Sequence, residues 1–332
     1  MNTTTTTTAL AKTSNFSIKP HYILLDMFLI SSIFLGFIFC ISFICISVGY
    51  RSCRSVLTLL SANSCIAGLI FNGVQLINAL LLFRDDIHLS TSNYSQFCEV
   101  RNYLMHVSGS LLYYSYCVQS ISRLFFVVFY RHKFLLTYHI HFVLIAIQWT
   151  LGLILPVSML TSGHRQYQTD TSQCFITIKN VSQTLYGMIS MFVLPMTIIS
   201  ICYTHIICFV RAAVRRARKT NALPIRKFNL VRDQGAIHIK HRFSSTKDIK
   251  VFRHIIILIT VLCIGGFPYS MLMVLNTQSI APFSIYRLCI TVFSLSVTVD
   301  MGAIFFFNKN VRTIFFNCFQ GQSNRIGSLN RG

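Results

Sequence analysis

The chain has 332 residues, 53% of them hydrophobic, and a formal net charge of +21 at pH 7. A chain with this many apolar residues leaves little length for a soluble domain. Because no soluble module that recognises nucleic acid is present, we expect no nucleic-acid binding. The positive charge instead fits basic loops at the anionic inner surface of a membrane.

Seven long apolar runs follow one another along the chain. Each reaches the roughly 20 residues that an α-helix needs to cross about 30 Å of hydrocarbon. Barrel strands are shorter and alternate between polar and apolar residues, and only helices or closed barrels satisfy the backbone hydrogen bonds inside a bilayer. We therefore predict an all-α fold, a bundle of seven transmembrane helices within residues 23–307. The runs are 24–48, 56–83, 98–129, 140–160, 183–210, 252–276 and 285–307.

Residues 1–22 precede the first run. They lack the basic start, apolar core and cleavage site of a signal peptide, so the first span is expected to act as its own signal-anchor. A threonine tract at 3–8 cannot bury apolar surface, and we expect residues 1–22 to be a disordered, glycosylated extracellular tail.

Lysine and arginine are divided unequally between the two sides of the predicted bundle. One set of connections carries 22 of the 29 such residues and the other set carries 7. The positive-inside rule places the first set in the cytoplasm, so the N-terminus is expected outside and the C-terminus inside, as in a multi-pass protein of the plasma membrane. The Asn-x-Ser/Thr sequons all fall on the predicted outer side, where glycosylation takes place; they are Asn2, Asn15, Asn93 and Asn180.

Two of the twelve cysteines lie at the predicted outer face, which is the oxidising side. Cys98 begins the third run, and Cys174 lies in the loop between the fourth and fifth runs. They are either two free thiols or a disulfide that ties this loop over the mouth of the bundle. We favour the disulfide, because a pair of thiols in an oxidising compartment usually closes.

Residues 211–250 form a long basic loop on the predicted inner side. The loop begins with RAAVRRARK, in which Arg211, Arg215 and Arg218 recur at helical spacing, so we expect the fifth helix to continue into the cytoplasm. The loop is a solvated tether near anionic lipid, a docking surface for a cytosolic partner, or both.

Residues 308–332 follow the seventh run. Val311, Ile314 and Phe315 would share one face of a helix, which predicts a short amphipathic helix lying parallel to the inner membrane surface, followed by a short cytoplasmic tail. Cys318 is either an ordinary cytosolic thiol or a palmitoylated anchor.

One spacing points to a family. Cys98, at the outer end of the third run, precedes Arg123, at the inner end, by twenty-five residues. This resembles the rhodopsin-like (class A) G-protein-coupled receptors, in which a Cys at the head of the third helix precedes the Arg of an Asp-Arg-Tyr motif by that distance. The resemblance covers essentially the whole chain. The other matching positions are Asn63, Trp149, Cys174, Pro195, Tyr203, Pro268 and 304–316.

The chain also departs from the family pattern at several motifs. Ser122 replaces the Asp before the third-helix Arg, Gly68 replaces the second-helix Asp, and Gly266 replaces the sixth-helix Trp. The seventh-helix motif reads Asp-Met-Gly-Ala-Ile from Asp300, with neither Pro nor Tyr. Because Gly68 supplies no ligand and one carboxylate is a poor cage for a hard cation, we predict no metal site.

Asp300 is the main acidic group deep in the predicted spans. Ionisable residues inside a membrane are functional hypotheses by default. The alternative is a structural carboxyl that is hydrogen-bonded to a neighbouring helix. The sequence leaves both open.

The resemblance implies a cell-surface receptor, in which an outer ligand and a heterotrimeric G protein favour the same conformation of the bundle. Arg123 and Tyr203 would contact the G protein, and Pro268 would let the sixth helix bend. The alternative is a channel or transporter with Asp300 in its pathway, although the spans offer no chain of charged residues for one. No catalytic motif of an intramembrane enzyme is present, so we expect neither enzymatic activity nor a cofactor.

Two positions of the resemblance argue against particular ligands. Met105 stands where amine receptors of the family carry an Asp, which argues against a protonated amine. Ser294 stands where opsins carry the Lys that binds retinal. A long and polar outer loop at 161–182 favours a peptide ligand, with a lipid as the alternative.

Because residue 122 is Ser, Arg123 lacks the adjacent carboxylate of the family. Asp248 is placed near the inner end of an extended sixth helix, where it would hold that helix against Arg123. Alternatively, it only neutralises Lys247 and Lys250. Under the restraint hypothesis, Asp248→Asn raises ligand-free signalling and Ser122→Asp lowers it.

Overall fold

The computed structural model describes residues 20–53, 55–88, 95–159, 165–168, 173–176, 181–221, 260–272 and 283–317. The sequons Asn2, Asn15, Asn93 and Asn180, together with Asp248 and Cys318, lie outside these residues. Only the backbone of Cys98 and Cys174 is described.

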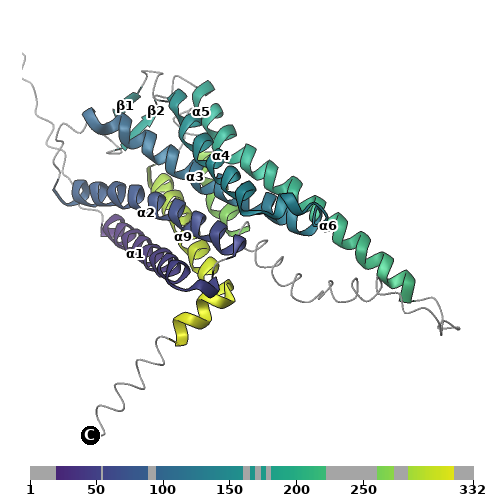
Figure 1. Ribbon diagram of the computed structural model, residues 1–332. Coiled ribbons are helices and arrows are strands. Elements are labelled where there is room, and N and C mark those ends of the chain that lie inside the picture. The colour runs from purple at the N-terminus through teal and green to yellow at the C-terminus, as the bar shows by residue number, and fades with distance from the viewer. Residues whose placement is uncertain are drawn as a thin grey trace, which may run out of the picture.

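The described residues form a bundle of long helices (Figure 1). Four of the seven predicted runs, 24–48, 56–83, 183–210 and 285–307, lie wholly within helical segments. The third run, 98–129, extends two residues beyond the end of α3, and the fourth, 140–160, is helical from its start to residue 159. The described residues 260–272 lie within the predicted sixth span. The helices are α1 (Pro20–Gly49), α2 (Val56–His88), α3 (Ser95–Val127), α4 (Tyr138–Ile154), α5 (Val181–Met188), α6 (Leu194–Asn221) and α9 (Phe283–Phe307). Within the described residues, five segments are long and apolar enough to cross a membrane; they lie in α1, in α2, in α4, in the fifth span and in α9.

α3 is 33 residues long yet is not one of those five. The reason is its position, since α3 packs against α2, α4 and α6. All fifteen residues from 106 to 120 are buried, including four serines, a histidine and a glutamine. A helix that is surrounded by protein does not need an apolar surface toward lipid.

The fifth span is one continuous helical segment with an irregular middle. The π-helical turn η4 (Ile189–Val193) lies between α5 and α6 and ends two residues before Pro195. The irregular turn is tied to α3, because the Tyr114 hydroxyl donates to the carbonyl of Ser190 at 2.9 Å. α6 continues through the basic stretch 211–219 to Asn221, as the sequence predicts, and projects beyond the rest of the bundle (Figure 1).

Polar residues cap two helices near the predicted inner surface. Ser55 precedes α2, and its Oγ accepts a hydrogen bond from the backbone N–H of Thr58 at 3.2 Å. Asn308 follows α9, and its Oδ1 accepts one from the N–H of Val311 at 3.3 Å. Asn308 thereby ends the seventh span and starts a further helix.

The further helix covers 309–317 and is the predicted helix after the last span. Val311 is fully buried, Ile314 and Phe315 are half-buried, and Lys309 is exposed. The ring of Phe315 lies 5.0 Å from that of Phe305 on α9, edge to face. These contacts hold the apolar face of the helix against the bundle.

A two-stranded antiparallel hairpin is a feature of the outer loop that the sequence analysis did not predict. β1 (Arg165–Gln168) pairs with β2 (Gln173–Ile176), and Cys174 lies opposite Tyr167. Both strands have only four residues, too few for alternation of polar and apolar residues to be recognised. β2 lies against α3, the helix that carries Cys98 near its first residue.

Candidate functional site

Near the predicted inner end of the bundle, Arg123 of α3 lies close to Tyr203 of α6, and the two side chains interact electrostatically. Tyr203 is buried, and Arg123 is partly buried. Arg123 lies four residues before the end of α3 at Val127. The structure therefore joins two of the predicted contact residues, whereas Pro268 lies exposed on the helix 260–272.

Ser122, next to Arg123, faces a different helix. Its Oγ lies 2.8 Å from Nε2 of His141 on α4, and both residues are completely buried. His141 was not predicted from the sequence, because a single histidine in an apolar run gives no signal of its partner.

A hydrogen-bonded group joins α2 to α4 at two of the positions that resemble the family. Trp149 donates its indole N–H to Oδ1 of Asn63 at 3.0 Å, and Nδ2 of Asn63 donates to Gln148 at 2.6 Å. Gln148 then donates to the Leu111 carbonyl of α3 at 3.2 Å. Each buried amide is satisfied, so this group fixes three helices relative to one another.

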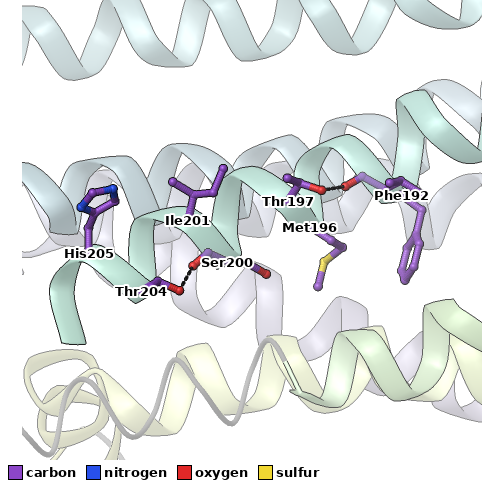
Figure 2. A pocket seen from close by; sticks show the side chains of 8 residues that line it. Phe192, Met196, Thr197, Ser200, Ile201, Thr204 and His205 are labelled. Atoms are coloured by element: carbon purple, nitrogen blue, oxygen red, sulfur yellow. Dashed lines mark hydrogen bonds between the residues drawn. The ribbon is translucent and has the colours of Figure 1, made fainter. Parts of the chain in front are cut away.

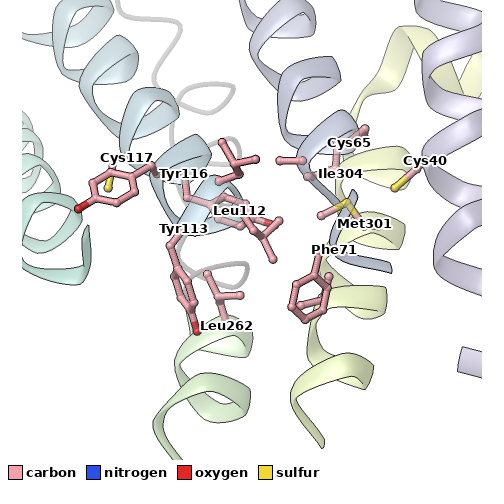
Figure 3. Close-up of a cluster of buried hydrophobic side chains, with 14 of the residues drawn as sticks. Cys40, Cys65, Phe71, Leu112, Tyr113, Tyr116, Cys117, Leu262, Met301 and Ile304 are labelled. Carbon is pink, nitrogen blue, oxygen red and sulfur yellow. The ribbon is translucent and has the colours of Figure 1, made fainter. Parts of the chain in front are cut away.

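Asp300 of α9 is completely buried, and neither carboxyl oxygen has a hydrogen-bond partner among the described residues. Tyr113 and Tyr116 of α3 and Cys263 of the helix 260–272 lie close enough to interact with Asp300 electrostatically. Figure 3 shows both tyrosines extending from α3 within the buried cluster. The predicted alternative of a hydrogen bond to a neighbouring helix is thus not found in the described part of the chain.

Met301 fills the space beside Gly68 of α2. A Cβ built on Gly68 would lie 2.7 Å from the Met301 sulfur, so a thioether occupies the volume into which a side chain at position 68 would project. Among the described residues, no group of three or more His, Cys, Asp or Glu side chains is arranged to hold a metal ion.

Aromatic rings occupy the space beside Gly266, where the family carries a tryptophan. A Cβ at Gly266 would overlap the Tyr113 hydroxyl and lie 3.0 Å from the Phe192 ring. Tyr113 is stacked on Phe293 at 6.2 Å, and Phe293 on Tyr269 at 5.6 Å. This stack joins α3, α9 and the helix 260–272, so the missing sixth-helix aromatic is replaced by one that comes from α3.

We expect Gly266→Ala to destabilise the receptor by about 1–3 kcal/mol, because the added methyl group overlaps a ring that stacking holds in place. Tyr113→Phe removes the overlapping hydroxyl, so the double variant Tyr113→Phe/Gly266→Ala should recover part of the loss. Thermal unfolding in lipid nanodiscs measures this. A loss that is the same in both backgrounds would contradict the assigned contact, and Gly73→Ala, where nothing lies within 4 Å of the added Cβ, is the matched control.

At the opposite end of the bundle, α1 and α9 are joined by a buried ion pair. Nη1 of Arg287 lies 3.4 Å from Oδ2 of Asp26, and both side chains are 3% exposed. The guanidinium also lies 4.8 Å from the ring centre of Tyr22, a cation–π arrangement. Arg287 is one of the seven basic residues assigned above to the outer side, and its pairing with Asp26 was not predicted, although an acid inside the first apolar run was a visible signal.

The two buried aspartates should respond in opposite directions to replacement by leucine. Asp26→Leu leaves Arg287 buried without this carboxylate, which should cost about 3–5 kcal/mol. Asp300→Leu removes a buried carboxyl that has no hydrogen-bond partner in the described residues, so the melting temperature should rise or stay unchanged. Melting curves of both variants test this, and a large destabilisation by Asp300→Leu would show that its carboxyl is held by a group outside the described residues.

An open groove of about 520 Å³ lies along the fifth span (Figure 2). The Thr197 and Thr204 hydroxyls in its wall bond to carbonyls of their own helix, those of Val193 and Ser200. Its lining contains no acid, lysine or arginine, so it offers no charged group to bind the terminus of a peptide. The lining residues are Phe192, Val193, Met196, Thr197, Ser200, Ile201, Thr204 and His205.

The fold and the inner-face residues together define a seven-helix membrane receptor. The family model described as "7 transmembrane receptor (rhodopsin family)" matches residues 40–301, so the chain belongs to the rhodopsin family of G-protein-coupled receptors. The chain is also similar to squid rhodopsin in fold, with a TM-score of 0.74, 14% identity, and coverage of 92% of this chain and 87% of that one. A comparison with curated protein sequences finds no match.

Membership of this family makes the chain a multi-pass membrane protein that transduces signals and is not an enzyme. Its partners in that role are a ligand and a G protein. The family does not indicate what kind of ligand this chain binds.

Proposed function

We propose that this chain is a plasma-membrane receptor with its N-terminus outside, which binds an extracellular peptide and activates a heterotrimeric G protein through Arg123. The observation that carries the proposal is the placement of Arg123, near the last turn of α3, beside Tyr203 of α6. α6 then continues into a basic helical stretch, in which Arg211 and Arg215 are exposed. A partly buried arginine beside an exposed basic helix suits an acidic or carbonyl-rich surface of a cytosolic protein.

The peptide ligand is supported by the outer hairpin. Among the described residues the sheet has two strands, so each strand has one edge to which no third described strand is paired. An extended peptide binds to such an edge through main-chain hydrogen bonds. β2 lies against α3, so a peptide bound at the hairpin would also be close to the helix that carries Arg123 at its far end. A ligand at this place can favour one arrangement of α3 over another.

The experiment is a screen of secreted peptides on cells that express the receptor together with sensors for the dissociation of several G proteins. A peptide that activates the wild type but not Arg123→Ala, at equal surface expression, supports the proposal. An ion current that depends on Asp300, without any G-protein response, would overturn it in favour of a channel.

A further inference from the structure

The inner ends of α3 and α4 are linked by a buried chain of three polar groups. Nδ1 of His141 lies 2.8 Å from the carbonyl oxygen of Thr137, the residue that precedes α4. Nε2 of His141 lies 2.8 Å from Oγ of Ser122. His141 and Ser122 are both 0% exposed. A buried imidazole is costly unless both nitrogens are bonded, and here both are.

The direction of these hydrogen bonds follows from the chemistry of the groups. A backbone carbonyl only accepts, so Nδ1 of His141 carries the proton and donates to Thr137. When the imidazole is neutral, Nε2 is then an acceptor, and the Ser122 hydroxyl donates to it. In this state Ser122, His141 and Thr137 form a relay of uncharged polar groups.

The same imidazole also contacts the next turn of α3. The ring of Phe126 lies 5.7 Å from that of His141, with an angle of 32° between the planes. Residues four apart share one face of a helix, so Ser122 and Phe126 present the same face of α3 to His141. One histidine thus holds two successive turns of α3, shortly before the helix ends at Val127.

Fixing Ser122 also fixes Arg123. Successive residues on an α-helix point about 100° apart. When Ser122 is directed toward α4, Arg123 is directed away from α4 and toward α6, where it interacts with Tyr203. A purely apolar contact would hold α3 near α4 but would specify its rotation less strictly, because hydrogen bonds are directional.

We propose that His141 is a positioning residue for G-protein activation: its relay to Ser122 sets the rotation of the inner end of α3 and so aims Arg123. This inference rests on the proposed function, since Arg123 is taken as the G-protein contact. It also changes the expectation for Ser122→Asp, because a carboxylate introduced at position 122 would face His141 rather than Arg123.

The test measures nucleotide exchange on a purified G protein by the full-length receptor in nanodiscs without ligand, together with binding of the nucleotide-free Gα subunit. Ser122→Ala and His141→Leu each break the relay, and we expect either to lower both readouts about two- to tenfold, the range that corresponds to one net hydrogen bond. Because both remove the same contact, the double variant should be no weaker than the weaker single variant. Losses that multiply, or a His141→Leu variant that couples like the wild type, would overturn the proposal.

Two further variants separate positioning from packing. The Gln side chain in His141→Gln retains an acceptor within reach of Ser122, so it should restore at least half of the activity that His141→Leu loses. Ser122→Asp should couple well when His141 is present, since the imidazole can pair with the carboxylate. It should couple poorly in the His141→Leu background, where Arg123 is the adjacent cation.

The control is His139→Leu, a substitution at an exposed position on the same helix, and it should leave both readouts unchanged. If His141→Gln and His141→Leu lose the same amount of nucleotide exchange, the packing of the ring and not its hydrogen bond to Ser122 positions Arg123, and the proposal is overturned.

A spectroscopic readout keeps the inference separate from the proposed function. With ¹⁵N-labelled histidine, the wild type should show His141 as the Nδ1–H tautomer, and Ser122→Ala should shift only its Nε2 signal. A wild type that activates no G protein would overturn the proposed function. If the Nδ1–H tautomer were nevertheless observed, the hydrogen bonds of His141 would join α3 to α4 without a role in activation, and the positioning role would also be overturned. A different tautomer in the wild type would overturn the relay itself, whatever the G-protein result.

Discussion

Replacing Arg123 by alanine should strongly reduce ligand-stimulated nucleotide exchange while leaving the receptor at the cell surface. The guanidinium is placed beside Tyr203 at the inner end of α3, and its charge-assisted hydrogen bonds to a G protein would be lost completely. One such bond contributes about 1.5–3 kcal/mol, so a loss of about ten- to a hundredfold in the rate of exchange is expected. Exchange on purified heterotrimer, at receptor amounts matched by surface labelling, measures this.

The matched control is Arg131→Ala. Arg131 is exposed in the turn that follows α3, so this variant removes the same charge from the same side of the bundle without removing the contact with Tyr203. It should couple like the wild type. Undiminished exchange by Arg123→Ala would show that this side chain does not carry the coupling. An equal loss in both variants would show that general positive charge carries it.

The helices could be predicted from the sequence because their signal is local. A run of apolar residues as long as a bilayer is thick identifies a span by itself, and the observed bounds of α1, α2 and α9 include the predicted runs with a few residues added at the ends. The helix at 309–317 was predictable for a similar reason, since its apolar face recurs at helical spacing and Asn308 is a good N-cap.

The contacts that give the site its chemistry could not be predicted, because they join residues far apart in the chain. Asp26 and Arg287 are 261 positions apart, and each alone reads as a charge near the end of a span. Tyr113 enters the space beside Gly266, and no local pattern links an aromatic residue in one apolar run with a glycine in another. Family resemblance showed which residue was missing at position 122 and not which residue had become its partner.

The irregular elements were missed for another reason. The π-helical turn η4 differs from an α-helix by a single residue in its hydrogen-bond pattern, so its apolar periodicity over Ile189–Val193 is almost unchanged. Its position next to Pro195 has a physical basis, because proline removes one backbone donor and disturbs the turn before it. The proline was visible in the sequence, but the form of the disturbance is decided by the contact of Tyr114 with the Ser190 carbonyl.

Mass spectrometry of the non-reduced receptor should find Cys98 and Cys174 joined in a disulfide. The nine cysteines whose side chains are described are all free, and β2, which carries Cys174, lies against α3, which carries Cys98. The bond would fix the outer hairpin at the head of the helix that ends in Arg123. Its loss should therefore cost about 2–5 kcal/mol and reduce both surface expression and the response to a peptide.

Serine variants test whether these two residues act as one unit. Cys98→Ser, Cys174→Ser and the double variant should have the same melting temperature, since each removes the same bond and the second substitution has nothing further to break. Cys289→Ser removes a free thiol from α9 and should leave stability and expression unchanged. If the two single losses add in the double variant, or both thiols react with an alkylating reagent before reduction, the hairpin is held by packing alone, and the topology that places both cysteines on the oxidising side is wrong at that point.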